Sequence, residues 1–199
     1  MNSLFSAVLL AGGKSRRMGR DKAFLEIDGL PLWRRQIALL QDLAPAELMI
    51  AGPPHSEWAE TGCVLVPDVR DDAGPLAGIV SSLRICSTPL LVTLAIDLPN
   101  ITSDYLEQLI GRCSPSKGAV PAEGEQFEPV AAVYPKAALA LAETCLAVGN
   151  WSLQEFARAC VRENLVAMVS ISDDEKSLFL NMNTPADLPA AAADHHVAE

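Results

Sequence analysis

Short apolar runs alternate with helix-patterned segments along the first 110 residues of the chain. The strand-like runs cover residues 7–10, 48–51, 63–66 and 90–96. The last run, Leu-Leu-Val-Thr-Leu-Ala-Ile, is apolar on both faces, which is typical of a strand inside a parallel sheet. Apolar positions at helical spacing predict helices over residues 31–44 and 75–86.

This alternation predicts a three-layer α/β/α fold with a Rossmann-like, mostly parallel sheet. In such folds, ligands bind beyond the carboxyl ends of the strands. The loops that begin near residues 11, 51, 68 and 97 are therefore expected to converge on one crevice.

The second half of the chain is less regular. Strands are expected over residues 119–122, 130–134, 166–171 and 178–182. Two helices are expected over residues 102 or 103 to 111 and from after 135 to about 149. A third is expected to begin at a capping box formed by Ser152 and Glu155, and a last one at Thr184. No repeat or linker interrupts residues 1–199, so a single domain is expected.

Composition and charge narrow the function. Half of the 199 residues are hydrophobic and the net charge is −10, which argues against broad nucleic-acid binding. The five cysteines are odd in number and form no Cys-x-x-Cys pair, so reduced thiols in the cytoplasm are expected. No apolar segment reaches the roughly 20 residues that span a bilayer, so no membrane partner is expected.

The segment after the first predicted strand carries an unusual density of positive charge. The strand ends in Ala11, Gly12 and Gly13, where missing side chains let backbone N–H groups approach a ligand. Five cations follow within nine residues: Lys14, Arg16, Arg17, Arg20 and Lys22. Such a turn suits a polyphosphate, although its spacing matches neither the P-loop nor the dinucleotide fingerprint. A plain glycine-rich turn with solvated cations is the alternative.

Asp97 directly follows the most strand-like run. One interpretation is an aspartate that caps the next turn, helped by Pro99. The other is a Mg²⁺ ligand, because magnesium is usually held by one or two carboxylates plus substrate phosphates.

The pattern Leu-Ala-Gly-Gly-x-Ser-x-Arg-Met-Gly-x-Asp-Lys over residues 10–22 closely resembles the signature of the nucleotidyltransferase family that includes molybdenum cofactor guanylyltransferase. Further segments match the family in order, so the resemblance spans residues 10–188. They are Gly-Pro-Leu-Ala-Gly at 74–78, Glu-Pro-Val-Ala-Ala-Val-Tyr at 128–134 and Asn-Met-Asn-Thr-Pro at 181–185.

The resemblance implies transfer of GMP from Mg-GTP to molybdopterin, with release of pyrophosphate. A nucleotide-binding half is then expected over about residues 1–110, and an acceptor-binding half over about 111–193. Molybdoenzymes or other cofactor-biosynthesis proteins would be further partners. The alternatives are a cytidylyltransferase for the same pterin, a sugar-phosphate nucleotidyltransferase, and a nucleotide-dependent chaperone for the cofactor.

The resemblance also assigns residues. The implied catalytic residues are Arg17, Lys22 and Asp97, with Asp97 as the Mg²⁺ ligand. The implied nucleotide-binding residues are Leu10, Ala11, Gly12, Gly13, Lys22, Asp68 and Asp97. The implied acceptor-binding residues are Gly74, Gly78, Asn181 and Asn183.

Two departures from the family pattern bear on these assignments. Ile96 precedes Asp97 where the family usually has a polar residue or cysteine, and Ala51 and Gly52 stand where it often has an asparagine near the base. The choice between guanine and cytosine is therefore open, as is the participation of Asp71 or Asp72. The lone loop histidine, His55, is assigned no role.

Overall fold

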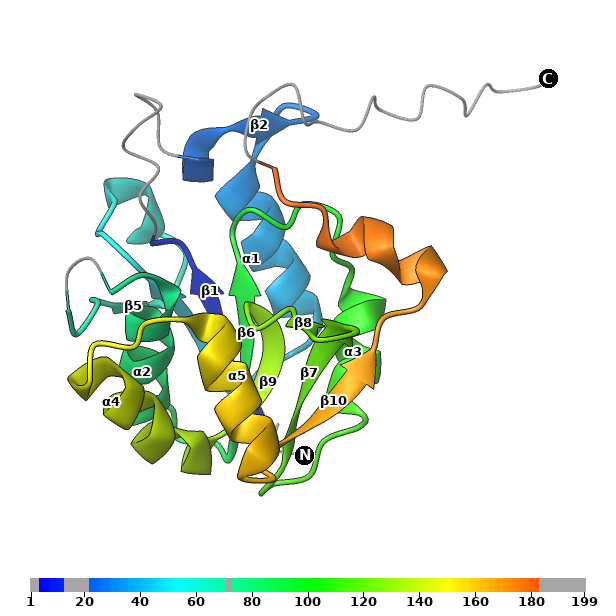
Figure 1. Cartoon of the computed structure of the whole chain (residues 1–199). Coiled ribbons are helices and arrows are strands. Elements are labelled where there is room, and N and C mark those ends of the chain that lie inside the picture. The colour runs from blue at the N-terminus through cyan, green and yellow to red at the C-terminus, as the bar shows by residue number, and fades with distance from the viewer. Residues whose placement is uncertain (1–3, 13–21, 71–72, 183–199) are drawn as a thin grey trace.

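The structure is a computed structural model and describes residues 4–12, 22–70 and 73–182 (Figure 1). Within these residues, eight strands form one sheet in the order β10-β7-β9-β6-β1-β4-β5, with β8 paired to β7. Their bounds are β1 Phe5–Leu10, β4 Leu48–Ala51, β5 Val64–Val66, β6 Leu90–Ala95, β7 Gly118–Glu123, β8 Gln126–Phe127, β9 Ala131–Pro135 and β10 Val166–Ser170. A two-stranded hairpin, β2 Glu26–Ile27 with β3 Leu30–Pro31, stands apart from this sheet.

The sheet is mostly parallel, as predicted. Strand β1 pairs in parallel with β4 and β6, β4 with β5, and β7 with β10. Strand β9 is antiparallel to both of its neighbours, β6 and β7. Residues 124–130 join β7 to β9, and so short a connection cannot make the crossover that a parallel pair needs.

Helices cover both faces of the sheet and complete the three predicted layers. The α-helices are α1 Leu32–Asp42, α2 Pro75–Ile85, α3 Ser103–Ile110, α4 Leu139–Ala147 and α5 Leu153–Arg162. Short 3-10 helices are η2 Lys22–Phe24, η3 Ser56–Trp58, η4 Lys136–Ala138 and η5 Asp173–Phe179. No helix in the described part of the chain is long and apolar enough to cross a membrane.

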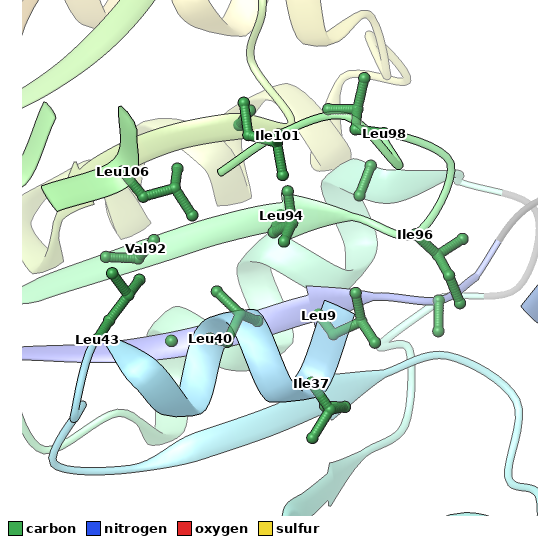
Figure 2. Packing of buried hydrophobic residues seen from close by; sticks show 14 of the residues in the cluster. Leu9, Ile37, Leu40, Leu43, Val92, Leu94, Ile96, Leu98, Ile101 and Leu106 are labelled. Atoms are coloured by element: carbon green, nitrogen blue, oxygen red, sulfur yellow. The ribbon is translucent and has the colours of Figure 1, made fainter. Parts of the chain in front are cut away.

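Two apolar cores lie on opposite faces of the sheet, because successive strand residues point in opposite directions. Leu9 belongs to the core shared with α1 and α3, and Val8 to the core shared with α2, α4 and α5. Figure 2 shows the first core, to which the strands contribute Leu9 and Leu94 and α1 contributes Ile37. One domain with two functional halves stays a prediction.

The strand predicted over residues 178–182 is wrong. Residues up to Phe179 form the 3-10 helix η5, and residues 180–182 follow it as an irregular segment. A capping box between Ser172 and Glu175 starts η5, and this local pairing favours a helical turn over a strand. The helix predicted from Thr184 lies outside the described residues.

The capping box predicted at Ser152 is half present. The Ser152 hydroxyl accepts a hydrogen bond from the Glu155 N–H at 3.3 Å, which caps α5. The Ser152 N–H donates to Asn150 Oδ1, also at 3.3 Å. Ser152 is therefore the N-cap, as predicted. Its own N–H, which in a complete capping box would donate to the Glu155 carboxylate, donates to Asn150 instead.

Two buried tyrosines differ in whether the hydroxyl is hydrogen-bonded. Tyr134 Oη donates to the Pro129 carbonyl at 2.8 Å, just before β9, whereas Tyr105 Oη is buried with no partner among the described residues.

We expect Tyr134→Phe to lower the free energy of unfolding by about 1–3 kcal/mol, since it leaves the Pro129 carbonyl without its hydrogen bond. Tyr105→Phe should be neutral or stabilising. Urea unfolding of both variants checks this, and equal losses would contradict it.

Candidate functional site

The turn after β1 lies between the carboxyl ends of β4 and β6. The Ala11 N–H donates to the Ala51 carbonyl at 2.8 Å, and the Ile96 N–H donates to the Leu10 carbonyl at 3.2 Å. The predicted convergence of these strand ends is therefore present, and β1 is the strand they share (Figure 1).

Gly52 brings the loop after β4 into contact with this turn. Its φ of +149° is one that side-chain-bearing residues rarely adopt. A Cβ added there would lie 2.8 Å from the Gly12 nitrogen and 3.0 Å from the Ala11 carbonyl carbon. Only glycine fits at position 52. The backbone of this loop therefore touches the backbone of the first turn, at the place where the family often has an asparagine.

Asp68 reaches the same turn from the loop after β5. It is half-buried. A Cβ built on Gly12 would lie 3.2 Å from Asp68 Oδ2, and one built on Gly78 would lie 3.4 Å from Oδ1. The carboxylate therefore lies between the first turn and α2, and its role in reading a nucleoside stays a prediction.

Ser81 on α2 holds this loop, a role that the sequence alone did not indicate. Its hydroxyl accepts a hydrogen bond from the Val69 N–H at 3.0 Å, next to Asp68, and only 4% of the residue is exposed. The signal was a polar residue on the otherwise apolar face of a predicted helix, but nothing in the sequence says which loop such a residue meets.

The two glycines of the 74–78 segment have different structural reasons. Gly74 precedes α2 with a φ of +65°, and an added Cβ would meet none of the described residues within 4 Å. A Cβ on Gly78 would lie 3.1 Å from both Ala51 Cβ and Leu10 Cδ2. Gly78 thus lies beside Leu10, which is predicted to bind the nucleotide, and the acceptor role implied for both glycines stays a prediction.

Asp97 follows β6 and is half-buried between two apolar anchors. Ile96 is 7% exposed and Leu98 is fully buried, and both belong to the core under α1 (Figure 2). The isoleucine that departs from the family pattern is therefore a core residue that fastens the end of the strand.

The segment that carries Asn181 reaches Asp97. The Met182 N–H donates to the Asp97 carbonyl at 2.9 Å, and Asn181, the exposed residue before Met182, therefore lies next to this turn. Asp97, the predicted metal ligand, and Asn181, a predicted acceptor-binding residue, are thus close in space although 84 positions separate them. The roles of both stay predictions.

Contacts of η5 hold this segment in place. Asn100 Nδ2 donates to the Ser177 carbonyl at 3.1 Å, and the Tyr105 and Phe179 rings meet edge-to-face at 5.3 Å. Lys176 Nζ lies 2.7 Å from Glu123 Oε1, at the end of β7. Burial, with a smaller contribution from Glu175, raises the pKa of Tyr105 to about 12.

Glu128 adds a half-buried carboxylate to the same edge of the sheet. Its N–H donates to the Pro121 carbonyl at 2.8 Å, and two residues later the Val130 carbonyl accepts from the Ala95 N–H at 2.9 Å. Burial raises the pKa of Glu128, and the neighbouring Glu123 adds to the shift. A partly desolvated carboxylate of this kind is typical of a functional site.

His55 takes part in an aromatic cluster, although the sequence suggested no role for it. Its ring lies 5.0 Å from that of Phe24 and 4.5 Å from that of Trp58. Phe24 ends η2, the 3-10 helix that begins at Lys22. The cluster therefore fastens the helix of Lys22 to the loop after β4.

Several predicted residues lie outside the described part of the chain. They are Gly13, Arg17, Asp71, Asp72 and Asn183. In the described residues no cluster of three or more His, Cys, Asp or Glu side chains forms a ready-made metal site. A single carboxylate such as Asp97 fits Mg²⁺ that arrives with substrate phosphates, since these ions usually bind one or two carboxylates.

Residues 7–164 match the family described as the MobA-like NTP transferase domain. The chain therefore belongs to the MobA-like NTP transferases, a family of nucleotidyltransferases.

Two curated relatives match nearly the whole chain. One from Opitutus terrae, named probable molybdenum cofactor guanylyltransferase, is 36% identical over 188 residues and 93% of both chains. One from Syntrophotalea carbinolica, named molybdenum cofactor guanylyltransferase, is 34% identical over 92% of this chain and 88% of its own.

Solved structures share the fold. Molybdopterin-guanine dinucleotide biosynthesis protein A from Archaeoglobus fulgidus superposes with a TM-score of 0.69 at 22% identity, over 92% of this chain and 94% of that one. A 2-C-methyl-D-erythritol 4-phosphate cytidylyltransferase from Thermus thermophilus gives 0.65 at 20% identity, over 90% and 93%. These likenesses confirm the predicted nucleotidyltransferase fold.

Gly52→Ala tests the backbone contact at the first turn. The added Cβ must push the turn away, so we expect GTP to bind at least about tenfold more weakly, as measured by calorimetry. Gly62→Ala is the matched control, because Gly62 also has a positive φ of +73°, but no described residue lies within 4 Å of the added Cβ. Unchanged affinity in Gly52→Ala would contradict the role of this contact.

Ser81→Ala tests the support of the Asp68 loop. Loss of the acceptor for the Val69 N–H should raise KM for GTP about 2- to 10-fold, the worth of one hydrogen bond. Ser82→Ala serves as the control, because within the described residues the Ser82 hydroxyl donates to the Gly78 carbonyl of its own helix at 2.8 Å and holds no loop. Equal KM values in the two variants would argue against this support.

Proposed function

We propose that this protein transfers the GMP unit of Mg-GTP to molybdopterin, forming molybdopterin guanine dinucleotide and pyrophosphate. The names of the curated relatives support this activity, and their matches span nearly the whole chain. The structural observation that carries the proposal is the hydrogen bond from the Met182 N–H to the Asp97 carbonyl. It brings the segment predicted to bind the acceptor to the residue predicted to hold the metal.

The donor nucleotide binds at the turn after β1. Because Gly12 and Gly52 carry no side chains, the turn and the loop after β4 pack closely together. The backbone N–H groups of the turn are the donors for the phosphate oxygens. Arg17 and Lys22 neutralise the triphosphate, Arg17 as a planar fork and Lys22 as a point charge. The Asp68 carboxylate accepts the paired N–H donors of the guanine edge, which neither cytosine nor adenine offers.

The transfer is an in-line displacement at the α-phosphorus of GTP. A terminal phosphate oxygen of molybdopterin forms the new P–O bond, the bond to the bridging oxygen breaks, and pyrophosphate leaves with the electron pair. Because the attacking phosphate is already anionic, no strong general base is required. Asn181 and Asn183 hold the acceptor in line with the α-phosphate.

Asp97 would hold the magnesium ion. Bound Mg²⁺ supplies charge neutralisation on the phosphates of the donor. Ile96 and Leu98, both buried in the core, fix the turn of Asp97 and so determine where the metal ion would bind. Because this turn is already in place, little of the free energy of substrate binding goes into ordering it, and that free energy can align donor and acceptor.

The reaction belongs in the cytoplasm, and molybdoenzymes or other cofactor-biosynthesis proteins would receive its product. Burial raises the pKa of Cys113 to about 11 and that of Cys160 to about 12, which keeps both as thiols. All five cysteines are free, as a reducing compartment allows.

The nucleotide preference tests the proposal. Purified protein with Mg²⁺, molybdopterin and one nucleotide at a time should release pyrophosphate with GTP alone, and chelation of Mg²⁺ should stop it. Asp97→Asn should lower kcat by about 10²–10³-fold, the loss typical of a key charge-stabilising group, and Lys22→Ala should abolish turnover. Asp104→Asn, an exposed aspartate on α3, is the control and should change kcat less than about twofold.

Other outcomes would select another function. Turnover with CTP would indicate a cytidylyltransferase, for which the missing asparagine at Ala51 and Gly52 leaves room. Turnover with a sugar phosphate would indicate a nucleotide-sugar enzyme. If Asp97→Asn kept full ability to mature a molybdoenzyme, a nucleotide-dependent chaperone would be the better description.

A further inference from the structure

Gln36 is a polar residue on the buried face of α1. None of its surface is exposed, and its neighbours on that face are Leu32, Trp33, Ile37 and Leu40. Burying an amide costs free energy unless its polar atoms are hydrogen-bonded. An apolar residue of similar size would therefore suit the helix better, and the presence of glutamine calls for an explanation.

The amide of Gln36 makes one long-range hydrogen bond. Its Nε2 donates to the Leu98 carbonyl at 2.7 Å, across 62 residues of sequence. Its Oε1 is buried with no partner among the described residues. The amide nitrogen is thus hydrogen-bonded, while the amide oxygen is buried without a partner. The bond to the Leu98 carbonyl is therefore the feature that explains a glutamine at this position.

That bond completes the set of contacts around Asp97. The Ile96 N–H donates to the Leu10 carbonyl at 3.2 Å, and the Asp97 carbonyl accepts from the Met182 N–H at 2.9 Å. The Leu98 carbonyl accepts from Gln36 and, at 3.4 Å, from the Ile101 N–H. The three successive residues are therefore held by β1, by the C-terminal segment and by α1.

The contact from Gln36 differs from the other two in kind. The bonds to Leu10 and Met182 join main-chain atoms, so a single substitution leaves their donors and acceptors in place. The bond from α1 comes from a side chain and can be removed alone. Ile96 and Leu98 are both buried around it in the core of Figure 2, so a change there reaches Asp97 through packed neighbours.

We propose that Gln36 is a positioning residue of the transfer reaction: by holding the Leu98 carbonyl, it sets where the Asp97 carboxylate stands. This inference rests on the proposed function, since it is the metal and the phosphates that require Asp97 at one place. Loss of the amide does not orphan the Leu98 carbonyl, because the Ile101 N–H also donates to it at 3.4 Å. Gln36 touches no substrate in this arrangement and acts only through the Asp97 turn.

The test replaces the amide by an apolar side chain of similar length, in Gln36→Met and, as a second variant, Gln36→Leu. The control is Gln41→Met, an exposed glutamine of the same helix. We expect the melting temperature of Gln36→Met to stay within about 3 °C of the parent, because an orphaned oxygen is lost together with a donor. The control should match the parent in every measurement.

Two readouts separate positioning from folding. In the transfer assay, Gln36→Met should lower kcat about tenfold and raise the Mg²⁺ concentration for half-maximal rate, with KM for GTP changed less than about twofold. In amide hydrogen exchange of the protein without ligands, the Ile101 and Met182 N–H groups should exchange at least about fivefold faster, since both bond to this turn.

The outcomes keep this inference apart from the proposed function. If the parent protein transfers no nucleotide but the exchange rates change, the proposed function fails and the control of the turn by Gln36 stands. If exchange and kcat both match the parent, the positioning role is overturned. Failure of both apolar variants to fold would overturn it as well, because Gln36 would then serve the fold itself.

Discussion

The register of three parallel strands is the constraint on which the site depends. Leu10 at the end of β1 pairs with Ala51 of β4 on one side and with Ala95 of β6 on the other. Because paired parallel strands end together, the loops that follow leave the sheet at one level. The glycine turn, the Gly52 loop and the Asp97 turn are therefore neighbours, although up to 86 residues separate them.

Each loop at this edge is fastened by a contact from outside its own strand. The loop of Asp68 is held by a serine of α2, and the turn of Asp97 by a glutamine of α1 and by the backbone of Met182. The 3-10 helix of Lys22 is held by aromatic contacts through His55. Helices from both faces of the sheet thus serve the site, in addition to closing the two cores.

The antiparallel strand β9 brings the loop of Glu128 to the edge of the sheet where Asp97 follows β6. It enters the sheet between β6 and β7, and its first residues lie at the edge where β6 ends, as the bond from the Ala95 N–H to the Val130 carbonyl shows. A parallel strand there would begin at the far edge. The position of the half-buried Glu128 depends on this reversal, which a connection of seven residues imposes.

The sequence by itself determined the strand and helix order of the first half, the bare glycine turn, and an aspartate at the end of the most apolar run. Those features follow from local patterns of apolar residues, glycine and charge. The tertiary structure alone decided that Ser81 meets the Val69 N–H, that Gln36 meets the Leu98 carbonyl, and that the Met182 N–H meets the Asp97 carbonyl. Such contacts join positions far apart in the chain, and the partner of a buried polar group depends on packing that no local pattern encodes.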